Sequence, residues 1–294
     1  MTTNPSTAAD FSAWVGRTEF LNDVASRSAA VGLAAVLDRP IALAAVDAAP
    51  LFPLGHWLQF LPSAPMSELG VDGHPKLGGF MPQLDLPRRM WAGSTIDFHA
   101  PIAVGQRLER ITTIESITPK HGSSGRLCFV VLRHDVSADG VHALTDRQTI
   151  VYREAVEVDP TAEPPRRAVQ GNPAATEGWD WVVDQQPVET TLFRYSALTF
   201  NSHRIHYDLP YATKAEGYPG LVVHGPLMAT YLVDGFLRTH SGAELTRFEF
   251  SARAPMFAGE LLHIVGRAEG AGQQALAVLG ADGTPAVTAK IAYR

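Results

Sequence analysis

The spacing of apolar residues predicts one long helix in each half of the chain. Apolar side chains recur every three or four positions over residues 18–37, and Pro40 follows them, so a helix is expected that ends before the proline. In the second half, a helix is expected from Gly225 to about Leu237, with Pro226 in its first turn. This second segment is apolar nearly all round, which is typical of a buried helix.

Short apolar segments separated by turn residues predict antiparallel strands in both halves. They cover about residues 107–117 in the first half and residues 261–266, 275–279 and 286–292 in the second. A buried helix packed against a curved antiparallel sheet, present twice, is an α+β layout.

An internal repeat supports the same division of the chain. The phrase Ala-Pro-x-x-x-Gly begins at Ala100 and again at Ala254, an Asp-Gly turn follows in each half, and both halves close on Tyr-Arg at 152–153 and 293–294. The offset between matching phrases shrinks along the chain. The first half is therefore expected to carry an insert, near residues 119–125.

These matches predict a tandem duplication with unequal halves. The first repeat is expected over residues 10–155 and the second over residues 186–294. Between them, residues 156–185 are rich in proline and glycine and are expected to form a linker over the surface.

Composition narrows the class of protein. With 294 residues, 46% hydrophobic residues and a formal charge of -6, the chain reads as globular, and no basic excess points to nucleic acid or an anionic membrane. Cys128 is the single cysteine, which excludes intrachain disulfides. Residues 1–5 show no signal-peptide pattern and no apolar run reaches membrane-span length, so a cytoplasmic protein is expected.

The candidate chemistry lies in a histidine-rich segment of the second half. Residues 199–206 read Thr-Phe-Asn-Ser-His-Arg-Ile-His. This resembles the motif Ser-Gly-Asp-x-Asn-Pro-Ile-His of the hydratase-2 (MaoC-like) enoyl-thioester hydratases. The resemblance places His206 at the catalytic histidine and Asn201 at the family's aspartate, and His224-Gly225 resembles the His-Gly pair that begins the family's central helix.

Two phrases of the first half, residues 86–93 and 120–125, resemble the type 2 hydroxyacyl-thioester dehydratases, a group that includes mesaconyl-C4-CoA and itaconyl-CoA hydratases. The resemblance implies a double hot-dog fold whose first repeat is catalytically degenerate. It also implies an acyl-CoA hydratase or dehydratase without a cofactor other than the CoA of its substrate, and it allows a homodimer.

Adding water to an enoyl thioester requires an activated water, a proton for Cα and stabilisation of the enolate oxygen. His206 can hold the water and move its proton. Asn201 cannot act as a base but can orient water, which favours a one-base mechanism. Asp208 either supplies a carboxylate in its place or caps a turn. The N–H of Gly225, at a helix N-terminus, is the expected donor to the enolate oxygen.

Further residues are candidates for substrate binding. His203 and His224 are expected at the wall of the pocket. Arg88 and Arg89, and similarly Lys120, either pair with CoA phosphates or are merely solvated.

Arg204 stands where the family has proline. It either binds a carboxylate on a mesaconyl-like or itaconyl-like acyl group or forms an ion pair with Asp208 or Glu216.

Three aromatic residues of the first half, Trp57, Phe60 and Trp91, either line an acyl tunnel or simply pack.

Three other functions compete with the hydratase. A hot-dog thioesterase would direct water at the carbonyl, and a non-catalytic acyl-CoA-binding protein would use no base at all. A metal site would need four donors from the same segment: His203, His206, Asp208 and His224. The spacing His-x-x-His alone is a weak signal for metal, so no metal is expected.

Overall fold

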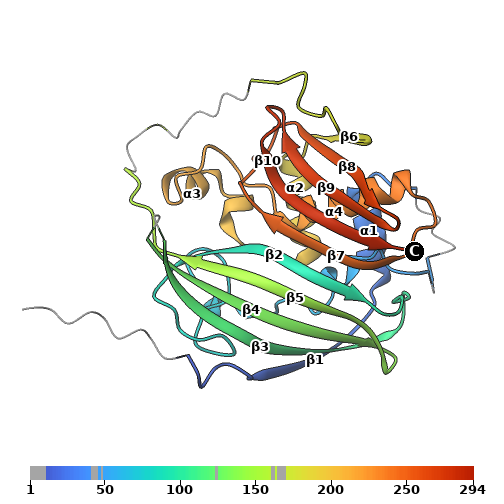
Figure 1. Ribbon diagram of the computed structural model, residues 1–294. Coiled ribbons are helices and arrows are strands. Elements are labelled where there is room, and N and C mark those ends of the chain that lie inside the picture. Colours follow the sequence, from blue (N-terminus) through green and yellow to red (C-terminus); the bar gives the residue numbers. More distant parts are fainter. Residues whose placement is uncertain (1–10, 41–45, 48, 123–124, 160–162, 164–169) are drawn as a thin grey trace, which may run out of the picture.

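The computed structural model describes residues 11–40, 46–47, 49–122, 125–159, 163 and 170–294. Residues 1–10, Ser123 and Ser124, and most of the proline-rich part of the expected linker lie outside this range. The described strands form one antiparallel sheet of ten strands in the order β1-β3-β4-β5-β2-β7-β10-β9-β8-β6 (Figure 1). Their bounds are β1 Thr18–Val24, β2 Arg88–Phe98, β3 Arg107–Gly122, β4 Gly125–Ala138, β5 Val141–Arg153, β6 Trp181–Gln185, β7 Leu245–Ala252, β8 Leu262–Gly270, β9 Gln273–Gly280 and β10 Pro285–Tyr293.

The strand order is symmetric about the middle of the sheet. β2 and β7 pair there, and β5, β4, β3 and β1 follow on one side as β10, β9, β8 and β6 follow on the other. The seam runs from Gly93 opposite Ser251 to Asp97 opposite Arg247, and it buries Ile96 against Phe248. Each half of the chain therefore contributes five strands to one continuous sheet.

The expected insert in the first half is a longer hairpin. β3 and β4 contain 16 and 14 residues, whereas β8 and β9 contain 9 and 8. The expected position, near residues 119–125, lies at the tip of this hairpin.

Within the described residues there are four α-helices and three short 3-10 turns, and α4 packs on the sheet. The helices are α1 Arg27–Val36, α2 Glu189–Thr199, α3 Leu209–Lys214 and α4 Gly225–Thr239, and the turns are η2 Gly55–Leu58, η3 Met66–Glu68 and η4 Arg204–His206. The prediction for α4 is confirmed. All its residues from Leu227 to Phe236 are buried, and it lies against β8, β9 and β10. In the described part of the chain no helix is long and apolar enough to cross a membrane.

The helix expected over residues 18–37 is wrong in its first part. Residues Thr18–Val24 form β1, which pairs with β3, and α1 begins only at Arg27. Phe20 and Val24, two residues of the helical pattern, are about half exposed along this edge strand. The Oγ of Ser26 accepts a hydrogen bond from the N–H of Ala29 (3.3 Å), so an N-cap at Ser26 separates strand from helix.

The expected linker also ends earlier than residue 185. β6 (Trp181–Gln185) pairs with β8 and is the outer strand of the second half. A five-residue strand next to a proline-rich segment gives a weak sequence signal, and only its pairing with β8 defines it.

Candidate active site

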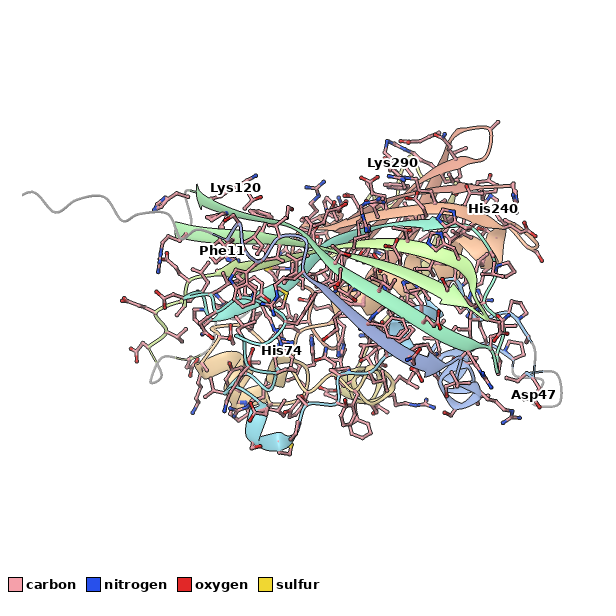
Figure 2. All side chains as sticks on the ribbon, turned by 90° about the horizontal axis from the view of Figure 1, so that it is seen from below. Phe11, Asp47, His74, Lys120, His240 and Lys290 are labelled. Carbon is pink, nitrogen blue, oxygen red and sulfur yellow. The ribbon has the colours of Figure 1, made fainter. Side chains whose placement is uncertain are left out.

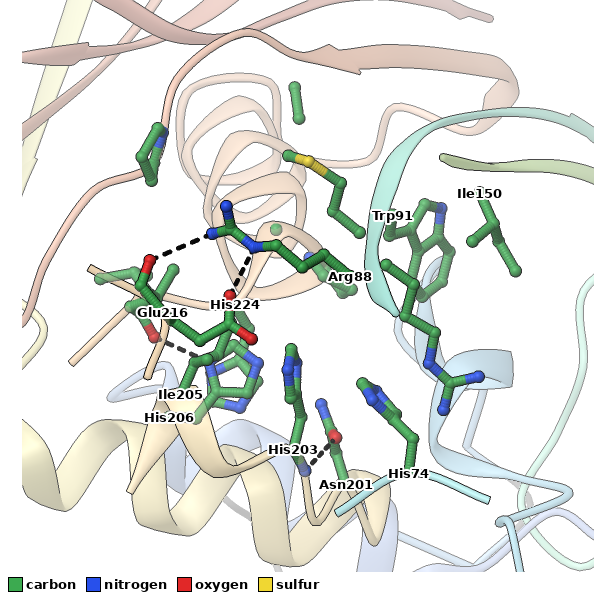
Figure 3. A pocket seen from close by; sticks show the side chains of 18 of the residues that line it. His74, Arg88, Trp91, Ile150, Asn201, His203, Ile205, His206, Glu216 and His224 are labelled. Carbon is green, nitrogen blue, oxygen red and sulfur yellow. Dashed lines mark hydrogen bonds and ion pairs between the residues drawn. The ribbon is translucent and has the colours of Figure 1, made fainter. Parts of the chain in front are cut away.

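A cavity of about 250 Å³ lies where the two halves meet near the N-terminus of α4 (Figure 3). Residues from β2 and the preceding loop form one wall, and the motif segment 201–206 with the start of α4 forms the other. The polar residues that line it are His74, Arg88, Arg89, Gln148 and Arg153 from the first half and Asn201, His203, His206, Glu216 and His224 from the second.

His206 is held in one orientation by the backbone. It lies in the turn η4, and its Nδ1 is 2.7 Å from the carbonyl oxygen of Val222. Since a carbonyl only accepts, Nδ1–H donates, and Nε2 is left as the hydrogen-bond acceptor of the ring. Burial lowers the pKa of His206 to about 4, so the ring is neutral near pH 7.

His224 lies against His206 with parallel rings. The ring centroids are 3.6 Å apart and the planes differ by 17°. The Nε2 of His224 is 2.9 Å from the Oγ of Ser196 on α2, whereas its buried Nδ1 has no hydrogen-bond partner among the described residues. Burial lowers the pKa of His224 well below its usual range. The site therefore holds two stacked neutral imidazoles, one with an unused ring nitrogen.

Gly225 is the first residue of α4 and lines the cavity, with Pro226 after it. An N–H in the first turn of a helix has no intrahelical acceptor, and the helix dipole adds partial positive charge there. The Gly225 N–H is thus placed at the cavity as a donor for a negative oxygen.

Asn201 lines the cavity just beyond the end of α2. Its Oδ1 accepts a hydrogen bond from the backbone N–H of His203 (3.0 Å). Phe200, which occupies the family's glycine position, adopts a left-handed backbone with φ 47°. One lone pair of the amide oxygen is thus used, and the NH₂ of Asn201 is a hydrogen-bond donor that a carboxylate at this position would lack.

Arg204 and Asp208 pair with each other, and neither lines the cavity. The Nη2 of Arg204 lies 2.7 Å from the Oδ2 of Asp208, and Asp208 also caps α3 by accepting from the N–H of Tyr211. Of the two alternatives for Arg204, the ion pair with Asp208 is confirmed. Asp208 is likewise a cap, at the N-terminus of α3, rather than a carboxylate in the pocket. The i, i+4 spacing of Arg204 and Asp208 brings their two charges together outside the pocket. Asp208 is therefore not placed beside His206 as a metal donor either.

The two arginines of β2 differ in their surroundings. The Nε of Arg88 is 2.5 Å from the Oε2 of Glu216, and its guanidinium lies over the ring of Tyr218. Arg89 lines the same cavity and forms no ion pair within the part of the chain that the structure describes. Burial lowers the pKa of His203, and the positive charge of Arg89 lowers it further. Arg89 is thus a cation at the histidine end of the pocket with no ion-pair partner among the described residues, and its charge also helps to lower the pKa of the Asp72 carboxyl group.

The remaining candidates differ in their position relative to the cavity, and Lys120 lies away from it. Lys120 lies over the ring of Phe129 in the long hairpin. Of the three aromatic residues, Trp91 lines the cavity, and Trp57 packs edge-on against it with centroids 4.9 Å apart. Phe60 packs beneath Arg110.

Two residues that the sequence analysis did not select belong to the site. His74 lines the cavity, and its ring centroid is 4.2 Å from that of His203 (Figure 3). The carboxylate of Asp72 is 2.8 Å from the Nδ1 of His74. The one signal in the sequence is the isolated phrase Asp-Gly-His-Pro at 72–75, which lies far from the motif along the chain. Asp72, His74 and His203 also offer three donor atoms within 4.8 Å of one another, a different set from the metal donors considered above.

Comparison with known proteins identifies the family of this chain. The model of the family "hydroxyacyl-thioester dehydratase type 2" matches residues 54–258. The mesaconyl-C4-CoA hydratase of Chloroflexus aurantiacus is 42% identical over 97% of this chain and 98% of that protein. The mitochondrial type 2 hydroxyacyl-thioester dehydratase of Schizosaccharomyces pombe is 30% identical over 76% of this chain and 81% of that protein.

Solved structures define the fold. A MaoC-like dehydratase from Phytophthora capsici superposes with a TM-score of 0.70 at 13% identity, covering 95% of this chain and 96% of that one. A Mycobacterium tuberculosis protein with a double hotdog fold gives 0.57 at 12% identity, with 95% and 96% covered. The ten-stranded sheet is thus a double hot-dog, as expected. Within that class, the chain belongs to the type 2 hydroxyacyl-thioester dehydratase family, and it is a hydratase or dehydratase of acyl thioesters, a lyase.

Proposed function

We propose that this enzyme adds water reversibly across the double bond of an enoyl-CoA, with His206 as the group that takes the proton from water. The observation that carries this proposal is the bond from His206 Nδ1–H to the carbonyl of Val222, which leaves a neutral Nε2 as acceptor in the cavity. A neutral imidazole in this tautomer can accept a proton from water as the oxygen attacks Cβ, and can return it to Cα. CoA enters as part of the substrate.

The enolate oxygen that forms during attack lies, in this proposal, at the N-terminus of α4. The Gly225 N–H donates to it, and the helix dipole stabilises its charge. Asn201 contributes its NH₂ group, a donor that orients the substrate or the water. His203 and His224 form the wall of the pocket around the reacting carbons.

An assay with a short enoyl-CoA tests the reaction class. Following the enoyl absorbance and free thiol together separates hydration, which removes the absorbance without releasing thiol, from thioester hydrolysis, which releases thiol. We expect the first result. A His206→Ala variant that kept the full rate would instead favour a non-catalytic pocket.

We further propose that the acyl group carries a second carboxylate, which Arg89 binds. Arg89 lines the cavity and has no ion-pair partner among the described residues, and guanidinium groups bind carboxylates through paired hydrogen bonds. The Chloroflexus relative, named for a substrate with such a carboxylate, points the same way. The earlier alternative for Arg89, a CoA phosphate, would place the cation at the opposite end of the substrate from the histidines.

Arg89→Met tests this assignment, with Arg204→Met as the matched control. Losing the pairing cation should lower kcat/KM for a dicarboxylic enoyl-CoA by roughly ten- to a hundredfold, and should leave a plain enoyl-CoA nearly unaffected. Arg204 is tied to Asp208 outside the cavity, so its variant should leave the ratio of the two substrates unchanged. An equal loss for both substrates in Arg89→Met would favour the CoA phosphate.

A homodimer and a cytoplasmic location stay predictions.

A further inference from the structure

A loop of the first half is bound tightly to the catalytic motif of the second. The N–H of Arg204 donates to the carbonyl of Asp72 (2.9 Å), and the Nη1 of Arg204 donates to the carbonyl of Val71 (3.0 Å). The hydroxyl of Ser202 donates to the carbonyl of Gly73. This loop therefore has a defined position relative to residues 202–204.

The close approach depends on the glycine at the centre of the loop. Gly73 has φ +88°, and a Cβ there would lie 1.9 Å from the carbonyl oxygen of Ser202. Any other side chain would push the loop away from the motif, and residue 74 with it. The backbone of the loop is thus shaped to place residue 74 against His203.

His74 is oriented by its own neighbour. Both carboxylate oxygens of Asp72 are used, one by the backbone N–H of His74 (3.0 Å) and the other by its Nδ1 (2.8 Å). Since a carboxylate accepts, Nδ1–H donates and Nε2 becomes the acceptor of the ring. The Nε2 of His74 has no hydrogen-bond partner within the described ranges, and His74 lines the same cavity as His206 (Figure 3). Figure 2 labels His74 in a view of the whole chain.

With Asn201 in place of the motif's aspartate, the site lacks one carboxylate acceptor for the attacking water. The hydratase motif has a carboxylate at this position, with two oxygens that accept hydrogens, whereas Asn201 has a single acceptor oxygen that already accepts from the N–H of His203, and its NH₂ is a donor. A water molecule that attacks Cβ has two hydrogens, and two acceptors are needed to turn its lone pair toward the carbon.

We infer that His74, held by Asp72, supplies the second acceptor for the attacking water that the family's aspartate supplies elsewhere. His206 Nε2 takes the proton that leaves water, the oxygen bonds to Cβ, and His206 returns this proton to Cα. His74 Nε2 accepts the hydrogen that stays on the new hydroxyl group. No charge remains on His74 at the end, so the step balances without any other reactant. The inference rests on the proposed hydration, and it assigns to the first repeat a direct part in catalysis.

A rescue experiment tests this role. His74→Gln should lower kcat for hydration by roughly tenfold to a hundredfold with KM changed far less, since the group acts on the attacking water. Adding Asn201→Asp to His74→Gln should raise kcat at least fivefold above that of His74→Gln alone, because it returns a carboxylate acceptor to the family's position. Asp72→Asn should lower kcat less than His74→Gln, because it removes only the orientation of the ring. His99→Gln, on an exposed histidine after β2, is the matched control and should have no effect.

Three outcomes overturn the inference. An unchanged kcat in His74→Gln, while His206→Ala has lost activity, would show that hydration holds and His74 has no part in it. Failure of Asn201→Asp to rescue a folded His74→Gln variant would reduce His74 to a structural residue. Binding of one Zn²⁺ per chain, lost in His74→Gln and required for activity after chelation, would make Asp72, His74 and His203 a metal site instead.

Discussion

The imidazole of His206 stacks on that of His224, with centroids 3.6 Å apart and 17° between the ring planes. The turn η4 brings one ring, and the residue before α4 brings the other. Two protonated rings at this distance would repel strongly in a buried site, so the stack requires at least one neutral ring. The stack therefore places His206, the proposed base, next to the start of α4, the helix that is proposed to bind the enolate oxygen.

Replacing His206 by Gln should remove proton transfer and keep the size of the side chain. Because general base catalysis contributes roughly a hundredfold to ten-thousandfold, kcat should fall by that factor while KM changes little. Steady-state hydration of a short enoyl-CoA measures both. A kcat within threefold of wild type would refute the role of His206.

Gly225→Ala tests the donor at the start of α4. A Cβ there would lie 3.7 Å from the carbonyl oxygen of Trp91, an ordinary contact, so the fold should tolerate it. The methyl group would, however, stand beside the N–H that is proposed to meet the thioester oxygen. We expect kcat/KM to fall by roughly ten- to a hundredfold, with a melting temperature close to wild type. A large loss of stability with intact activity in the surviving enzyme would contradict this placement.

The buried histidines predict that acid destabilises the fold. Burial lowers the pKa values of His206 and His134 to about 4, below those of unfolded histidine, so the unfolded chain binds more protons between pH 6.5 and 4. The free energy of unfolding should therefore have its full value above about pH 6.5 and should decrease as the pH falls toward 4. Urea unfolding at a series of pH values measures this decrease. A free energy that stays constant over that interval would show that these rings are not held neutral.

The rate should show a different pH limit. His206 can accept a proton only when neutral, so kcat should stay level from pH 7 down to about pH 5 and fall near its pKa of about 4. A fall centred on pH 6.5 instead would indicate a base with an ordinary histidine pKa. Measurements are restricted to pH values at which the protein remains folded by circular dichroism.

The seam between the two halves predicts a position that tolerates only glycine. A Cβ on Gly93 would lie 2.3 Å from the carbonyl oxygen of Phe250, a backbone atom that cannot move without breaking the β2–β7 pairing. Gly93→Ala should therefore cost about 2–4 kcal/mol of stability. Gly79→Ala, which meets no atom within 4 Å, is the matched control. Similar unfolding midpoints for the two variants would contradict the tight seam.

Local patterns in the sequence predicted the second half well. The motif at 199–206 is continuous in the chain, so its resemblance to the hydratase motif could be identified there, and the apolar segment from Gly225 predicted a buried helix. The first half was harder. Residues 18–24 carry a spacing that fits a helix, yet they pair with β3, because strand pairing depends on a partner almost ninety positions away.

The sequence by itself predicted the repeat from matching phrases in the two halves and the α4 helix from its apolar spacing, and resemblance to a short continuous motif indicated His206. Tertiary structure alone decided which charges meet. It paired Arg88 with the distant Glu216, left Arg89 without an ion-pair partner among the described residues, and placed His74 against His203. The physical reason is that hydrogen bonds and ion pairs act over a few ångströms in space. Which distant residues come that close is determined only when the two halves fold onto each other.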